Sequence, residues 1–167
     1  GLFVNVDGKK YAVSKGDVIT YQYVLNVPGV KISSFDANTF YDTDGLDLIP
    51  FMDGDTVDDA KHFPALPSVI SNVTDIDGEV YYNYSNYKGT SLENKVVFTA
   101  QFKVTAAEGT YTITTRIKTM ADTSMNALVY NFEKQGEFTE ESGLVDYVEP
   151  STNDEPTVVE PTTADKE

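Results

Sequence analysis

The sequence contains no cysteine, no tryptophan and only one histidine among its 167 residues. Without cysteine the chain can form no disulfide, no thiolate metal site and no cysteine nucleophile. The single histidine, His62, cannot build a zinc site of the usual His-rich kind, and no Gly-x-Ser-x-Gly motif accompanies it as part of a catalytic triad. These absences argue against an enzyme and against a bound cofactor.

Positive charge is also scarce, because 12 Lys and Arg face 27 Asp and Glu and give a formal net charge of −15. Nucleic acids and anionic membranes are bound mainly through Lys and Arg, so neither is an expected partner. No apolar run approaches the ~18 residues that span a bilayer, and no signal peptide is present. The strand-like opening Gly1 to Val4 is typical of a module taken from a longer protein.

Aromatic and β-branched residues are abundant instead, with 11 Tyr and 9 Phe, and they favour strands. Asp7-Gly8 between two short apolar runs predicts a tight hairpin, and Pro28-Gly29 predicts a turn. Apolar and polar residues alternate, and turn signals recur about every ten residues, as in an all-β sandwich or barrel. Strands are expected within these segments: 2–6, 9–13, 17–27, 32–41, 46–51, 80–84, 96–104, 111–118, 128–132 and 144–148.

Two segments depart from this pattern. Residues 149–167 are rich in Pro, Thr and acids and contain no aromatic residue, which predicts an extended acidic linker after a domain of residues 1–148. Residues 53–73 are the least regular segment and predict a loop, with a short helical turn around 68–72. Asp42-Thr43-Asp44-Gly45 and Asp75-Ile76-Asp77-Gly78 do not have EF-hand spacing, so no metal ligands are assigned and a looser calcium loop stays open.

The order of several segments resembles the cohesin modules of bacterial cellulosomal or amylosomal scaffoldins. The segments are Gly16 to Tyr21, Ile32 to Asp42, Gly45 to Ile49, Lys95 to Val104 and Glu108 to Ile113. The resemblance implies a nine-stranded antiparallel jelly-roll β-sandwich that is not a catalyst. It also implies an extracellular or cell-surface module of an anaerobic bacterium, monomeric when unbound. Such a module binds a calcium-loaded dockerin on an enzyme or another scaffoldin and so assembles a polysaccharide-degrading complex.

The strand expected at 32–41 offers a candidate contact face. Phe35, Ala37, Thr39 and Tyr41 can pack inward, which sends Ser34, Asp36 and Asn38 outward. By resemblance, Ser34 and Asp36 fall where cohesins place polar dockerin contacts. An ordinary solvated sheet face remains the alternative.

A tyrosine-rich run supplies the second candidate. It comprises Tyr81, Tyr82, Tyr84 and Tyr87 together with Asn83 and Asn86. Because a strand alternates, this run places Tyr on both faces, and the resemblance assigns Tyr82 and Tyr84 to the dockerin. A core strand is the alternative, and a slip of one residue would expose Tyr81 and Asn83 instead.

Two other functions remain open for a secreted sandwich with Tyr-rich strands. One is a carbohydrate-binding module, although the lack of Trp removes its best stacking surface. The other is a spacer domain without a ligand. A planar row of exposed Tyr would favour sugar, and a polar, aliphatic sheet face would favour dockerin.

Overall fold

The protein is described by a computed structural model that covers residues 1–6, 8–50, 52–53, 56–57, 59–66, 70–130, 151–152 and 158–162. The elements are β1 (Leu2–Val6), β2 (Lys9–Ala12), β3 (Val18–Tyr41), β4 (Leu46–Leu48), β5 (Met52–Asp53), β6 (Thr56–Val57), α1 (Asp59–His62), β7 (Ile70–Ile76), β8 (Glu79–Val104), β9 (Gly109–Asp122), β10 (Ala127–Tyr130), β11 (Ser151–Thr152) and β12 (Val158–Thr162). No helix among the described residues is long and apolar enough to cross a membrane.

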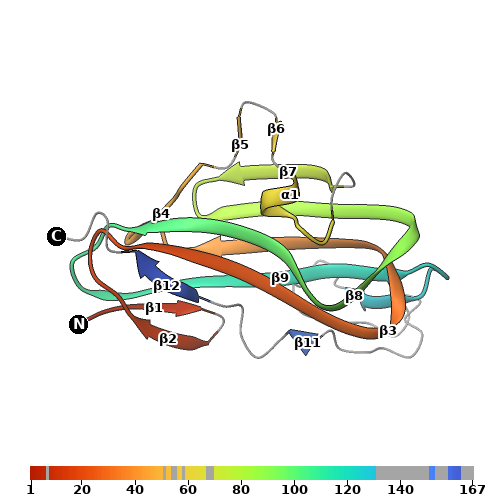
Figure 1. Cartoon of the computed structure of the whole chain (residues 1–167), viewed down its shortest axis with the longest axis horizontal. Coiled ribbons are helices and arrows are strands. Elements are labelled where there is room, and N and C mark those ends of the chain that lie inside the picture. The colour runs from red at the N-terminus through yellow and green to blue at the C-terminus, as the bar shows by residue number, and fades with distance from the viewer. Residues whose placement is uncertain are drawn as a thin grey trace.

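Two long strands organise the fold, and both turn back at the right-hand end of the molecule in Figure 1. β3 and β8 are antiparallel partners, with Val18 opposite Lys103 at one limit and Phe40 opposite Glu79 at the other. Their register shifts between Val27 and Lys31. Val27 pairs with Leu92 and Lys31 pairs with the adjacent Ser91, so three residues of β3 are left between the two pairs as a bulge. The bulge bends both strands together, so each strand contributes one half to each layer of a sandwich.

The two layers follow from this folding of one ten-stranded sheet, whose central order is β2-β1-β9-β3-β8-β4. One layer combines β7, residues 79–91 of β8, residues 31–41 of β3, and β9. The other combines residues 92–104 of β8, residues 18–27 of β3, and β4. The all-β sandwich is therefore confirmed.

Details of the strand pattern differ from the jelly roll expected from the sequence. The expected count of nine strands is not confirmed, because the described residues form twelve strands, several of them very short. Among the described pairs, β1 with β9 is parallel and the others are antiparallel. The hairpin of β1 and β2 is confirmed, with Val6 opposite Lys9 and Gly8 at φ 94°. Pro28-Gly29 is not a turn between separate strands, since β3 continues through the bulge.

The expectation of a loop over residues 53–73 was wrong in part. The short helix is α1, at Asp59–His62, and β7 begins at Ile70, where a helical turn was expected. The strand expected at 144–148 lies outside the described residues. The linker boundary at 149 also stays a prediction, although β11 and β12 pair with β3 at Leu25–Asn26 and Val18–Tyr21.

The core is aromatic. Tyr82 stacks on Phe98 with ring centroids 4.6 Å apart, and Phe63, just after α1, lies 5.3 Å from Tyr82 and 5.5 Å from Phe98. A chain of hydroxyl groups also crosses between the layers inside the core. It runs from Tyr21 through Thr115 and Thr39 to Tyr82, with successive distances of 2.5, 2.7 and 3.5 Å. These contacts hold the two layers at a fixed spacing.

The turn between β9 and β10 is organised by Asp122, which is buried. One carboxylate oxygen accepts the backbone N–H groups of Ser124 and Asn126 at 2.8 and 2.9 Å, and the other accepts Asn126 Nδ2 at 2.9 Å. Burial alone would raise the pKa of Asp122. The three hydrogen bonds outweigh burial and lower the pKa below its ordinary value of 3.8.

We expect Asp122→Ala to lower the free energy of unfolding by about 1–2 kcal/mol near neutral pH, since it removes a carboxylate that accepts three hydrogen bonds. The pKa is depressed in the folded state, so the stabilisation is present above the unfolded pKa and disappears as pH falls through the folded pKa. Urea unfolding of wild type and variant at about pH 7 and about pH 2 checks this. A difference that stays constant with pH would contradict it, and Asp44→Ala, at an exposed turn, is the control.

Candidate functional site

The register places a set of polar side chains on the outer surface of the layer formed by β7, β8, β3 and β9. Phe35, Ala37, Thr39 and Tyr41 are buried, as the alternation predicts. Ser34 and Asp36 are partly exposed, whereas Asn38 is only 1% exposed. Across the strands, Ser34 lies opposite Ser85, Asp36 opposite Asn83, and Asn38 opposite Tyr81. We call this surface the polar face and define it by Ser34, Asp36, Asn38, Glu79, Tyr81, Asn83, Arg116, Lys118 and Thr119.

The outward orientation predicted for Tyr82 and Tyr84 is wrong. Tyr82 is 0% exposed and Tyr84 is 1% exposed, and both rings pack against Phe35. The hydroxyl of Tyr84 is hydrogen-bonded to Thr90. The strand is shifted by one residue from the assignment that the resemblance gave, so the partly exposed side chains at these positions are Tyr81 and Asn83.

Hydrogen bonds fix the positions of the polar face. Asn38 Nδ2 donates to the carboxylate of Glu79. Thr119 Oγ1 donates to Asp36 Oδ2 at 3.2 Å, and the Tyr81 hydroxyl is also hydrogen-bonded to Asp36. Burial, the charge of Asp36 and this hydrogen bond together raise the pKa of Tyr81, so its hydroxyl keeps its proton and remains a donor. Asp36 is thus held between β8 and β9.

Basic side chains from β9 balance these acids. Asp36 pairs with Thr119, and the next residue, Ala37, pairs with Ile117. Lys118 therefore forms a β-bulge between the two pairs. The ammonium group of Lys118 lies 5.9 Å from the centre of the Tyr81 ring, and Arg116 is exposed opposite Asn38. Among the described residues of the polar face, two acids therefore stand beside two bases. Across these members the charges balance, unlike the charges of the whole chain.

Two amide oxygens on this face are buried and lack hydrogen-bond partners in the part of the chain that the structure describes. They are Oδ1 of Asn38 and Oδ1 of Asn83. Their residues are diagonal neighbours, because Asn38 pairs with Tyr81 and Asn83 with Asp36. A buried acceptor without a donor costs about 1–3 kcal/mol, so such groups in a native protein call for an explanation. The protein itself covers both oxygens, so a donor from a bound partner reaches them only when the two side chains rotate outward on binding.

Sequence reasoning missed four members of the polar face: Glu79, Arg116, Lys118 and Thr119. A signal was present, since Arg116 and Lys118 alternate with the apolar residues Ile113 and Ile117 in the sequence. This alternation could not assign Arg116 and Lys118 to the polar face, because only the strand order shows that β9 lies beside β3. The alternation alone does not say which strand is the neighbour.

The other candidate residues, His62 and Asp42, have structural roles. His62, which lies in the segment expected to be a loop, is buried, and its Nδ1 lies 2.9 Å from the carbonyl oxygen of Thr99. Asp42 closes a turn, because its carbonyl oxygen accepts the backbone N–H groups of Gly45 and Leu46 and its carboxylate accepts the N–H of Thr112. Within the described ranges, no three acidic or histidine side chains are grouped in a way that could hold a metal ion.

Comparison with known proteins identifies the fold. No protein-family model and no curated protein matches the sequence. The structure is similar to a chain of Coh-OlpA–Doc918, a type I cohesin–dockerin complex from Clostridium thermocellum, with a TM-score of 0.54 and 21% identity over 77% of this chain and 89% of that one. The protein therefore has the cohesin β-sandwich fold.

Two further solved structures are similar to a lesser degree. One contains the sixth cohesin of scaffoldin B from Acetivibrio cellulolyticus in complex with a Cel5 dockerin, with a TM-score of 0.47 and 17% identity over 78% of this chain and 92% of that one. The other is the seventh ScaB type I cohesin from Pseudobacteroides cellulosolvens, with a TM-score of 0.48 and 17% identity over 75% of this chain and 80% of that one.

Proposed function

We propose that this protein is a non-catalytic module that binds a dockerin through the polar face. The observation that carries the proposal is a surface of fixed, partly exposed polar groups on a sheet that has the cohesin fold, beside the amide oxygens of Asn38 and Asn83, which have no hydrogen-bond partner among the described residues. Ser34 and Asp36 belong to the same surface. The neighbour Coh-OlpA–Doc918 is itself a cohesin–dockerin complex, which supports the choice of partner.

The chemistry of the polar face specifies what the dockerin must present. Asn38 and Asn83 lack donors among the described residues, and once their side chains rotate outward their oxygens can accept hydroxyl, amide, Lys or Arg groups. Asp36 offers a carboxylate whose position is already fixed by Tyr81 and Thr119, so little side-chain entropy is lost on binding. Arg116 and Lys118 favour an acidic group on the partner at the β9 side. Specificity therefore comes from matched polar groups.

The biological role follows from the dockerin as partner. The dockerin carries the calcium and belongs to an enzyme or another scaffoldin, so the complex is an extracellular or cell-surface assembly for polysaccharide degradation. An interface of ordinary size buries about 1,600 Å² in total, which a flat four-stranded face can supply. The module acts as a monomer that holds its partner in place and performs no chemistry.

The carbohydrate-binding alternative lacks a supporting feature on this face. Sugar rings stack on flat aromatic surfaces, and a row of exposed Tyr was the expected sign. Of the tyrosines that β8 carries, Tyr82 and Tyr84 are buried, Tyr81 is partly covered and engaged with Asp36, and Tyr87 alone is 84% exposed. The layer presents a polar surface, which is the sign expected for a dockerin.

Isothermal titration calorimetry against a panel of dockerins and soluble polysaccharides, with and without calcium, tests the proposal. We expect one-to-one binding to at least one dockerin, and loss of that binding when calcium is chelated, since the dockerin unfolds without its metal. Binding of a polysaccharide in the absence of any dockerin binding would contradict the proposal and support the sugar-binding alternative.

A further inference from the structure

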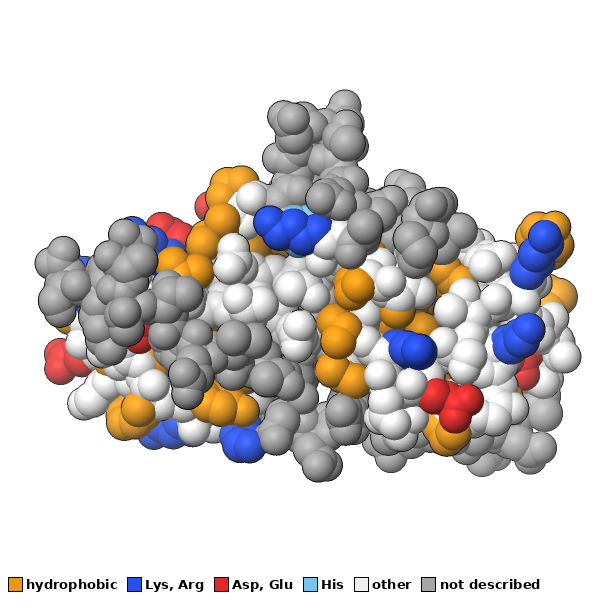
Figure 2. Space-filling view, viewed as in Figure 1, with side chains coloured by type: hydrophobic (Ala, Val, Ile, Leu, Met, Phe, Trp, Pro, Cys, Tyr) orange, Lys and Arg blue, Asp and Glu red, His pale blue; other side chains and the backbone are white. Residues whose placement is uncertain are grey.

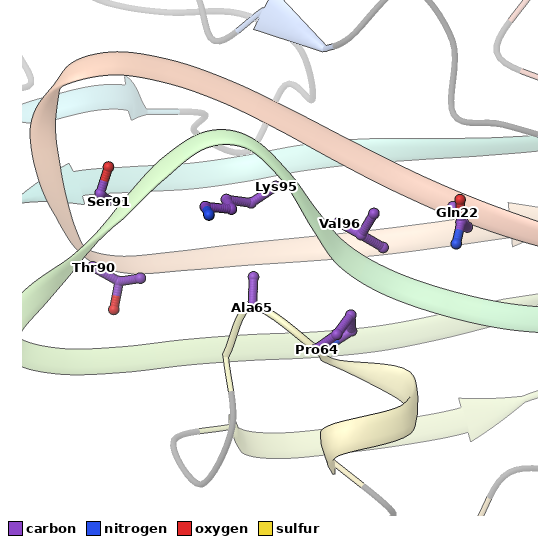
Figure 3. A pocket seen from close by; sticks show the side chains of 7 residues that line it. All are labelled: Gln22, Pro64, Ala65, Thr90, Ser91, Lys95 and Val96. Atoms are coloured by element: carbon purple, nitrogen blue, oxygen red, sulfur yellow. The ribbon is translucent and has the colours of Figure 1, made fainter.

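The strand β8 forms an arch at the end of the molecule where β3 and β8 bend. On one side of the arch Ser85 pairs with Ser34, and on the other side Thr90 pairs with Ile32. Residues 86–89 therefore stand opposite a single residue of β3. Figure 3 shows the bent strands from close by, with Thr90 of β8 beside the turn of β3.

The arch packs against the turn of residues 123–126 between β9 and β10. Gly89 has a φ of 75°, and a Cβ on it would meet the side chains of Thr123 and Lys31. The N–H of Thr123 also donates to the carbonyl oxygen of Lys31 at 3.1 Å. Within the arch, Asn86 Oδ1 accepts the backbone N–H of Lys88 at 3.1 Å. Two turns from distant parts of the chain are thus fixed against each other.

Each of these turns presents a large apolar side chain to solvent. Tyr87 in the arch is 84% exposed and Met125 in the turn after β9 is 88% exposed. Tyr87 is two residues from Gly89 and Met125 is two residues from Thr123, so the contact between the turns brings both side chains to the same end of the molecule. Figure 2 shows hydrophobic side chains beside lysines at the right-hand end, where Figure 1 places the bends.

Met125 is held in a backbone conformation that suits glycine. Its φ is 66°, in the left-handed region that a residue with a Cβ rarely adopts. Asp122 imposes this conformation, because its carbonyl oxygen accepts the N–H of Met125 at 3.1 Å and its carboxylate accepts the N–H groups of Ser124 and Asn126. An exposed methionine adds little to the stability of the fold at such a position. Strained backbone around an exposed apolar side chain points to a contact outside the chain.

These apolar side chains continue the polar face toward the bend. Successive side chains of a strand alternate between its faces, so Tyr87 follows Tyr81, Asn83 and Ser85 on the outer side of β8. Four residues of a strand span about 13 Å, which is the reach from Asn83 to Tyr87. An interface of ordinary size covers about 800 Å² of each partner and is wider than this. One partner can therefore cover the polar face and both apolar side chains.

The groove near the bend is a different surface. It has a volume of about 410 Å³, and Figure 3 shows Pro64 and Ala65 of the turn after α1 on one side and Lys95 and Val96 of β8 on the other. Lys95 and Val96 belong to the layer that does not carry the polar face. The apolar surface that continues the polar face is therefore that of the two exposed side chains.

We propose that Tyr87 and Met125 form an apolar anchor for the dockerin at the bend end of the polar face. This inference rests on the dockerin-binding function proposed above. The dockerin must present an apolar side chain at this end, in addition to polar groups for Ser34 and Asp36. Tyrosine is enriched among the residues that dominate binding energy, and the flexible methionine side chain adapts to the shape of its partner.

Calorimetric titration of Tyr87→Ala with a dockerin that binds the wild-type protein tests the tyrosine. We expect about tenfold weaker binding and a less negative heat-capacity change, because less apolar surface is buried. Tyr87→Phe keeps the ring and should bind within about twofold of wild type. Tyr11→Ala is the control, since it removes a partly exposed tyrosine from β2, outside the layer of the polar face, and should also bind within about twofold.

Met125→Gly tests the methionine by two measurements with different expected outcomes. Glycine adopts a positive φ without strain, so the urea midpoint of unfolding should equal or exceed that of wild type. Dockerin binding should nevertheless become about tenfold weaker, because the apolar side chain is gone. A methionine kept only for the fold would instead give a lower midpoint with unchanged binding.

The outcomes separate this inference from the proposed function. Dockerin binding by the wild-type protein that Tyr87→Ala and Met125→Gly leave unchanged would overturn the anchor and leave the proposed function intact. Equal weakening by Tyr87→Ala and Tyr11→Ala would also overturn the anchor. Failure of every dockerin to bind the wild-type protein would overturn both, and a polysaccharide bound through Tyr87 in that case would assign this tyrosine to sugar.

Discussion

Tyr82→Ala is expected to lower the free energy of unfolding by about 3–5 kcal/mol, as for other large aromatic residues deleted from a core. Tyr82 is 0% exposed and is stacked on Phe98 with centroids 4.6 Å apart. The residue also contacts Phe63 and Phe35, so its removal leaves a cavity between the two layers. Chemical unfolding in urea measures the change.

Two companion variants make this result decisive. Tyr82→Phe keeps the ring and removes only a hydroxyl that lies 3.5 Å from Thr39, so it should cost about 1 kcal/mol. Tyr87→Ala changes a tyrosine of the same strand that is 84% exposed, and its effect should stay within about 0.5 kcal/mol. Equal unfolding midpoints for Tyr82→Ala and Tyr87→Ala would contradict the core position of Tyr82.

Asp36→Arg is expected to weaken dockerin binding about a hundredfold or more, because it reverses a fixed charge in the middle of the polar face. Asp36 lies between Tyr81 of β8 and Thr119 of β9, with Lys118 and Arg116 on the β9 side. An arginine there loses the acceptor and places a third positive charge beside two others. Calorimetric titration with a dockerin that binds the wild-type protein measures the effect.

The matched control is Asp44→Arg, which makes the same change of charge at an exposed turn beyond the end of β3. We expect it to bind dockerin within about twofold of wild type, since surface charges far from an interface act mainly through screened long-range forces. The milder double variant Ser34→Ala with Asp36→Ala should weaken binding while leaving thermal unfolding nearly unchanged. Unchanged affinity in Asp36→Arg would rule out the polar face as the dockerin site.

The bend in the long strands was not predictable from local signals. Pro28-Gly29 has the composition of a turn, and Gly29 does have a positive φ of 85°. The chain nevertheless remains in β3, because β8 bends at the same place and keeps its pairing on both sides of the bulge. Gly89 of β8 also has a positive φ of 75°, and a Cβ there would meet Thr123 and Lys31. The conformation depends on a partner strand some sixty residues away.

The sequence alone determined the fold class and, within a strand, which residues share a face. Alternation of apolar and polar residues has a period of two, so it fixed that Ser34, Asp36 and Asn38 share one face and that Phe35 and Ala37 share the other.

The tertiary structure decided which face of the Tyr81–Tyr84 segment turns inward, because tyrosine suits a core and a surface equally. Packing of Tyr82 against Phe63 and Phe98, which are distant in sequence, settled that choice and left Tyr81 and Asn83 on the polar face. Strand order decided that Arg116 and Lys118 belong to the same site, since neighbours in a sheet are set by long-range pairing.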